Sequence, residues 1–145
     1  MRILGIESSC DDLAVCLFEG PDHIVSEGVA SQEKTHARYG GIVPEIASRE
    51  HLLSISSLVE SVIQKAPEEK RSFEGVAVTS SPGLIGSLLV GLNFAKGLAL
   101  SRNIPLIGVN HLEGHLMSVF LEEQKPSFPF LGLAISGGHT HFYWV

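Results

Sequence analysis

The sequence predicts an open α/β sheet in which the first three strands are antiparallel and the later strands are parallel. Three apolar, β-branched stretches follow one another with short links near the N-terminus, as in an antiparallel meander. Farther along, stretches of strand length alternate with stretches of helical periodicity, so those strands should run parallel. The chain has 145 residues, 44% hydrophobic and 18% charged, which is enough for one globular core.

The first three strands are expected at 2–8, 13–20 and 23–31, where apolar and β-branched residues are frequent. Gly-Pro-Asp at 20–22 is a turn signal between the second strand and the third. Residues 31–45 carry mixed charge and a Gly-Gly pair, which predicts a loop.

A long helix should follow this loop. We expect it to begin near Pro44, because proline suits the first helical turn, and to end at Pro67. Its apolar stripe is expected to consist of Ile46, Leu52, Leu53, Ile55, Leu58, Val59 and Ile63. Its polar residues are assigned to the solvated face, namely Glu45, Arg49, Glu50 and His51.

Strands and helices then alternate. We expect a strand at 73–81, a tight loop at 81–87, a helix at 88–103, a strand at 104–110 and a third helix at 111–123. The element order is therefore βββαβαβ followed by a helix. Small residues on one side of the helix at 88–103 imply close packing.

Two final strands, at 130–138 and 140–145 after a linker at 125–129, start a second sheet that the chain barely enters. We expect three segments, with an N-terminal domain at 1–110, a connecting helix and linker at 111–127, and the start of a second domain at 128–145. Because this sheet stops after one hairpin, we expect the sequence to be part of a longer protein.

Charge and cysteine content restrict the function classes. The formal net charge of −6 argues against strong phosphate-backbone binding by this chain alone, so a nucleic-acid substrate would need positive charge from another domain or a partner. A disulfide between Cys10 and Cys16 is conceivable, but two isolated thiols fit a reducing cytoplasm better. We find no signal or transit peptide and no apolar run that could span a bilayer, so we expect a cytoplasmic protein.

His111 and His115 lie four residues apart in a predicted helix, so both project from one face, about 6 Å apart. They are either two ligands of one metal ion or two exposed histidines at a strand–helix junction. The zinc-peptidase motif requires Glu directly after the first His, where this chain has Leu112. A third ligand would be His139, His141 or a carboxylate beyond residue 145.

Three further motifs have both a functional and an ordinary interpretation. "GIESSCDD" (5–12) is either a phosphate-holding turn in which Asp11 or Asp12 orients a water or a hydroxyl, or a plain polar turn. "SSPGLIGS" (80–87) precedes a helix N-terminus, where backbone N–H groups can bind an anion. It lacks the lysine of a P-loop, so we favour a tight connection between strand and helix. "SGGHT" (136–140) either admits a ligand close to the backbone or is a common glycine turn.

These motifs, together with "YGGIVPEIASREH", "SSPGLIGSLLVGLNFAKGLA", "NHLEGHL" and "AISGGHT", closely resemble the TsaD family, also called Gcp or the Kae/Qri type. The resemblance covers essentially all 145 residues, and "YGGIVPE" is similar to the bacterial or organellar branch. It implies an RNase H-like domain of the actin/Hsp70/sugar-kinase (ASKHA) fold. It also implies transfer of a threonylcarbamoyl group from threonylcarbamoyl-adenylate to N6 of the tRNA adenosine beside the anticodon.

The resemblance also implies site residues. His111 and His115 match the family's two metal-ligating histidines, for iron or zinc, whose third ligand is an Asp near the C-terminus that this chain does not contain. Asp11 matches the acidic position that faces the reaction centre, and Ser9 sits beside it. The adenylate-contacting loop corresponds to Ala134, Ile135, Ser136, Gly137 and Gly138.

Two positions depart from the family pattern. Asp12 stands where the family usually has Glu, and Ala134 stands where archaeal-type members can offer a tyrosine ligand. The nucleotide-binding residues of the second domain are also absent from this chain.

The hypothesis from these residues is acyl transfer, in which a metal at the histidine pair polarises the threonylcarbamoyl carbonyl and Asp11 positions or deprotonates the amine. The expected partners are tRNA and TsaB-, TsaC- and TsaE-like proteins, with a dimer through the helices at 44–66 and 88–103. The alternatives are a metallopeptidase and a non-catalytic half that binds a TsaB-like partner.

Overall fold

A computed structural model of the protein describes residues 1–135 and 140–145. Its main sheet has the order β3-β2-β1-β4-β5. The strands are β1 (Arg2–Glu7), β2 (Leu13–Glu19), β3 (His23–Ala30), β4 (Gly75–Ser81) and β5 (Leu106–Asn110). The first three strands pair antiparallel, whereas β4 runs parallel to β1 and β5 parallel to β4. The predicted mixed α/β sheet is therefore confirmed.

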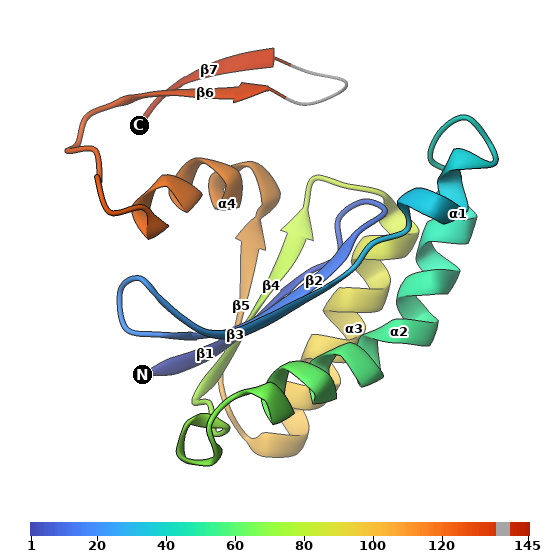
Figure 1. Ribbon diagram of the computed structural model, residues 1–145, viewed down its shortest axis with the longest axis horizontal. Helices are drawn as coiled ribbons and strands as arrows, with labels where there is room; N and C mark the ends of the chain where they lie inside the picture. The colour runs from blue at the N-terminus through green and yellow to red at the C-terminus, as the bar shows by residue number, and fades with distance from the viewer. Residues whose placement is uncertain (136–139) are drawn as a thin grey trace.

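Two long helices cover one face of this sheet (Figure 1). They are α2 (Pro44–Lys65) and α3 (Ile85–Arg102). Proline occupies the first turn of α2, as predicted. Helix α3 begins three residues before the predicted position, and Asn103, which caps its C-terminus, adopts the left-handed conformation. The predicted small face of α3 is also found, because Ser87, Gly91, Ala95 and Ala99 are all buried.

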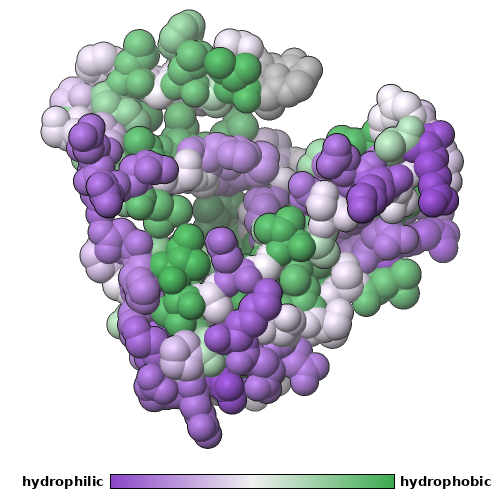
Figure 2. All heavy atoms as spheres, viewed as in Figure 1, coloured by the Kyte–Doolittle hydropathy of each residue, from purple (hydrophilic) through white to green (hydrophobic). Residues whose placement is uncertain are grey.

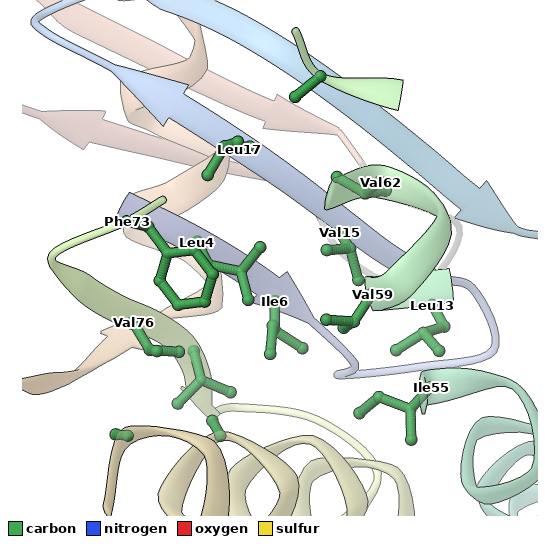
Figure 3. Packing of buried hydrophobic residues seen from close by; sticks show 14 residues of the cluster. Leu4, Ile6, Leu13, Val15, Leu17, Ile55, Val59, Val62, Phe73 and Val76 are labelled. Carbon is green, nitrogen blue, oxygen red and sulfur yellow. The ribbon is translucent and has the colours of Figure 1, made fainter. Parts of the chain in front are cut away.

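The core lies between the sheet and these two helices (Figure 3). Side chains alternate along each strand, so Leu4 and Ile6 of β1 point to the helices while Glu7 points to the opposite face. Figure 3 shows Ile55 and Val59 of α2 pointing toward the apolar side chains of β1 and β2. Burial of each such side chain stabilises the fold by about 1.5–3 kcal/mol. This packing holds the end of β1 beneath the histidine pair.

A short helix, α1 (Glu33–Ala37), interrupts the segment predicted to be a loop. The prediction was wrong because a helix of five residues is too short for apolar periodicity. Polar side chains hold it in place instead. Gln32 donates from Nε2 to the carbonyl of Ala47 at 3.2 Å, and its Oε1 lies 3.0 Å from Nε2 of His36.

The buried stripe of α2 also differs from the prediction. Leu52 and Leu53 are 67% and 77% exposed, and His51, assigned to the solvated face, is fully buried. The observed stripe has a spacing of three or four residues and comprises Ala47, His51, Ile55, Val59 and Val62. The polar type of His51 concealed its place in this stripe.

After β5 the chain forms α4 (His111–Met117) and the 3₁₀ turn η2 (Ser118–Leu121), so the predicted third helix is shorter than expected. A second 3₁₀ turn, η1 (Glu68–Lys70), lies between α2 and β4. No helix in the described part of the chain combines the length and apolar character needed to cross a membrane.

The last two strands, β6 (Leu131–Ile135) and β7 (Thr140–Trp144), pair antiparallel in a sheet of their own. Figure 2 shows hydrophobic side chains gathered over this ribbon at the top of the view, and Leu131, Ile135 and Trp144 are among the exposed ones. A two-stranded ribbon is marginally stable by itself. The predicted domain limits at residues 110 and 127 remain predictions.

Candidate metal and substrate site

The histidine pair is positioned by the junction of β5 and α4. Asn110, the last residue of β5, caps α4 because its Oδ1 accepts hydrogen bonds from the backbone N–H groups of Leu112 at 2.9 Å and Glu113 at 3.3 Å. The helix therefore begins at His111, and His115 follows one turn later on the same face.

The two imidazole rings converge. Nε2 of His111 lies 3.1 Å from Nε2 of His115, the ring centroids are 4.4 Å apart, and the ring planes are inclined by 79°. Zinc binds histidine nitrogens at about 2.0–2.1 Å, which places two nitrogens of a tetrahedral site about 3.3 Å apart. The rings thus fit a shared ion after a shift of a few tenths of an ångström.

A complete set of ligands is not present in the part of the chain that the structure describes, because no three His, Cys, Asp or Glu residues gather there as a metal site would require. His141, one of the candidate third ligands, lies on β7 outside any such group, and His139 falls outside the described residues. A metal at His111 and His115 would need a further ligand from elsewhere.

Glu7 is the carboxylate that contacts His111, and it was not among the predicted site residues. Its Oε2 lies 3.2 Å from Nδ1 of His111 and accepts a hydrogen bond from the hydroxyl of Thr79. Its Oε1 accepts from the backbone N–H of Ser9 at 2.5 Å. The sequence signal for Glu7 is its position as the last residue of the first strand, inside "GIESSCDD", where the predicted site residues were the later aspartates.

Hydrogen bonding controls the charge state of Glu7. Burial by itself would raise the pKa of its carboxyl group, but the hydrogen bonds from Ser9, Thr79 and His111 outweigh burial and lower the pKa below its usual value. Glu7 is therefore ionised at neutral pH and acts only as an acceptor.

Ser9 contacts His111 as well, with its Oγ 3.1 Å from Nδ1. Ser9 and Glu7 contact the same ring nitrogen, whereas a hydrolase triad places the serine and the carboxylate on opposite nitrogens. The arrangement is not that of an activated serine nucleophile.

Asp11 and Asp12 lie in the turn beyond Ser9. The carbonyl of Asp11 accepts a hydrogen bond from Nε2 of His51 at 3.3 Å, and Oδ1 of Asp12 accepts from the backbone N–H of Gln32 at 3.2 Å. Burial raises the pKa of the Cys10 thiol, and the neighbouring carboxylate of Asp11 raises it further. Both cysteines of the chain are free thiols.

The "SSPGLIGS" loop supports this turn by close packing. The backbone N–H of Leu84 donates to the carbonyl of Ser9 at 2.7 Å, and a Cβ on Gly83 would lie 2.4 Å from that oxygen. The tight strand–helix connection favoured from the sequence agrees with this geometry, because the glycine is needed for the backbones to approach.

A groove of about 530 Å³ lies between α4 and the sheet. It is on the sheet face opposite α2 and α3 (Figure 1). Its floor is apolar and includes Gly5, Cys16 and Ala77, while His111 and His115 line it from α4. The groove brings space for a ligand next to the two imidazoles.

The expected adenylate loop falls partly outside the described residues, since these exclude Ser136, Gly137 and Gly138. Ala134 and Ile135 form the end of β6, where Ala134 pairs with His141. The contact of this loop with an adenylate remains a prediction.

A family profile described as tRNA N6-adenosine threonylcarbamoyltransferase (TsaD) matches residues 23–145. Two curated proteins with that name, from Syntrophus aciditrophicus and Geobacter sp. strain M21, are 50% and 52% identical over all 145 residues. The chain spans 43% and 42% of their lengths.

A solved structure, YeaZ from Pseudomonas aeruginosa, has a similar fold, with a TM-score of 0.62 at 11% identity over 100% of this chain and 67% of that one. At this identity the likeness concerns the fold alone.

Proposed function

The chain belongs to the TsaD family of tRNA N6-adenosine threonylcarbamoyltransferases, and we propose that, within a longer polypeptide, it transfers a threonylcarbamoyl group from threonylcarbamoyl-AMP to N6 of the tRNA adenosine beside the anticodon. The observation that carries the proposal is the convergence of His111 and His115, within a chain about 50% identical to named members over its whole length. Because the chain spans less than half of those relatives, the remaining polypeptide supplies the rest of the site.

The metal centre of this proposal is one divalent ion, iron or zinc, held by His111 and His115 and a third ligand outside this chain. Their Nε2 separation of 3.1 Å supports it, as does the carboxylate on the far nitrogen of His111. An ion held by these residues would supply Lewis-acid chemistry at the threonylcarbamoyl carbonyl.

The chain's own residues bind and orient the reactants. The adenosine N6 attacks the carbonyl carbon, a C–N bond forms, the C–O bond of the mixed anhydride breaks, and AMP leaves. Asp11 positions the amine or takes the proton that N6 loses, with Ser9 beside it. The segment from Ala134 to Gly138 holds the adenylate.

The net charge of the chain and its exposed apolar side chains support particular partners. A net charge of −6 leaves the positive surface for tRNA to the rest of the polypeptide or to a partner. Exposed apolar side chains of α2 and α3, among them Leu52 and Leu89, border a groove of about 350 Å³ that supports docking of a TsaB-like protein. TsaC-like and TsaE-like proteins complete the system, and the two free thiols support a cytoplasmic setting.

The test uses a chimaera in which residues 1–145 are joined to the C-terminal part of the Geobacter relative. The chimaera is incubated with threonylcarbamoyl-AMP, unmodified tRNA and a TsaB-like partner, and the tRNA nucleosides are analysed by mass spectrometry. We expect N6-threonylcarbamoyladenosine from the parent and loss of both product and bound metal in His111→Ala.

The control is Glu113→Gln, an exposed residue on the same helix, which should keep both activity and metal. Product formation by a metal-free His111→Ala protein would remove the metal from the reaction. Cleavage of peptides by the parent, without tRNA, would favour the metallopeptidase instead.

A further inference from the structure

Glu7 ends β1 beneath the first turn of α4 and contacts β4, α4 and the turn that follows β1. Its two oxygens receive the backbone N–H of Ser9, the hydroxyl of Thr79 and, at 3.2 Å, Nδ1 of His111. We propose that Glu7 is a positioning residue that fixes the tautomer and the orientation of His111, so that the Nε2 lone pair is presented to His115. The consequence for metal binding rests on the proposed function, whereas the tautomer does not.

The hydrogen bonds around His111 determine which of its ring nitrogens carries the hydrogen. Both oxygens of Glu7 already accept hydrogen bonds, Oε1 from the Ser9 N–H and Oε2 from the Thr79 hydroxyl, so in its contact with Nδ1 of His111 the Oε2 atom is again the acceptor and the hydrogen is on Nδ1. A neutral imidazole carries only one such hydrogen, which leaves Nε2 with a free lone pair. Metal-binding histidines in proteins are commonly oriented in this way by a carboxylate on the other nitrogen.

The carboxylate is itself held in place. Thr79 and Ser9 are 5% and 2% exposed, and their hydrogen bonds occupy one oxygen each of Glu7. Ser9 Oγ lies 3.1 Å from Nδ1 of His111 and can share its hydrogen as a second acceptor. Glu7 therefore cannot turn away without breaking two hydrogen bonds, and the ring orientation of His111 is set before any ligand binds.

The tautomer of His115 is not fixed by a carboxylate in this way. Without a cation, the 3.1 Å contact between the two Nε2 atoms requires that His115 donates its Nε2–H to the lone pair of His111. To bind a cation, His115 must move its hydrogen to Nδ1, whereas His111 needs no change. The exposed His115 is thus the adjustable member of the pair and the half-buried His111 the fixed one.

The first experiment reads the tautomers directly. Long-range ¹H–¹⁵N spectra of the histidine side chains, recorded on the 145-residue chain near pH 8, should show Nδ1–H for His111 and Nε2–H for His115. In Glu7→Ala the Nε2–H form of His111 should rise at least severalfold. The matched control is Glu27→Gln, an exposed carboxylate that lines the same groove, and it should leave His111 unchanged.

Backbone amide spectra establish that each variant is folded. If Glu7→Ala fails to fold, the isosteric Glu7→Gln replaces it, and its weaker acceptor should give a smaller rise of the same sign. The proposal is overturned if His111 carries its hydrogen on Nε2 in the parent, or if a folded Glu7 variant keeps the parental tautomer.

A second experiment separates this inference from the proposed function. Calorimetric titration of the chimaera with Zn²⁺ should show binding that weakens about 10–100-fold in Glu7→Ala, the usual effect of losing such a carboxylate. An unchanged zinc affinity in that variant would overturn the role of Glu7 in metal binding. A parent chimaera that binds no zinc would overturn the proposed metal site, while the tautomer result would still decide the part played by Glu7.

Discussion

Gly91→Ala tests the packing that places the end of β1 beneath the site. Gly91 is buried on α3, and a Cβ added there would lie 2.0 Å from Oγ of Ser8 and 2.9 Å from its Cβ. Ordinary contacts between such atoms are about 3.5–4.0 Å. Ser8 is fully buried, so α3 and the backbone that follows β1 must separate to admit the new atom.

Two opposing effects set the change in the free energy of unfolding in Gly91→Ala. Inserting a methyl group into a close-packed core costs about 1–3 kcal/mol, and the upper end applies because the Cβ of Ser8 is bonded to the backbone directly after β1 and cannot rotate away. Alanine regains about 1 kcal/mol of helix propensity over glycine. We therefore expect Gly91→Ala to lower the free energy of unfolding by about 2 kcal/mol.

The control is Gly97→Ala on the same helix, where an added Cβ meets nothing within 4 Å. This variant should gain about 0.5–1 kcal/mol, because only the propensity changes. Urea unfolding followed by circular dichroism measures both. Equal stability of the two alanine variants would refute the close approach of α3 to Ser8.

Three further predictions concern the site's surroundings. Burial lowers the pKa of His51, and the facing carboxylates of Asp11, Asp12 and Glu7 offset this only in part, so the folded state favours neutral His51. The unfolded chain protonates near pH 6.5, so stability should fall as the pH drops below that value, by at most about 1.4 kcal/mol per pH unit, in urea titrations. His51→Gln should remove this dependence, and an equally steep fall in that variant would contradict the assignment. Asn110→Ala should cost about 1 kcal/mol by removing the cap of α4, whereas Asn93→Ala, exposed on α3, should stay within about 0.5 kcal/mol, and equal losses in urea unfolding would argue against the cap. Gly83→Ala should displace the Ser9 carbonyl and move the side-chain ¹⁵N signals of His111, and unchanged signals in a folded variant would contradict the packing.

The sequence predicted the sheet well because its signals are local. The alternation of apolar residues at 2–8 and 13–20, and the prolines around the long helix, depend on neighbours in the chain. The helix α1 and the burial of His51 depend on side-chain hydrogen bonds to Gln32 and Asp11, which periodicity does not record.

Only the part of the site that depends on neighbouring residues in the chain was predicted from the sequence. The spacing of His111 and His115 reports helix geometry, so their convergence could be expected. Glu7 lies 104 residues away from His111 in the chain, and only the parallel pairing of β1 with β4 and of β4 with β5 brings it there. A strand-ending carboxylate next to small hydroxyl residues is the one sequence feature that marks it.

The central claim is that His111 and His115 share one divalent cation. X-ray absorption at the zinc edge of the zinc-loaded chimaera tests it most directly, since imidazole nitrogens at about 2.0–2.1 Å give a recognisable scattering pattern. We predict two imidazoles per zinc in the parent, and loss of the bound zinc when both histidines are replaced by alanine. A zinc spectrum that is the same in the parent and in the double variant would contradict the claim.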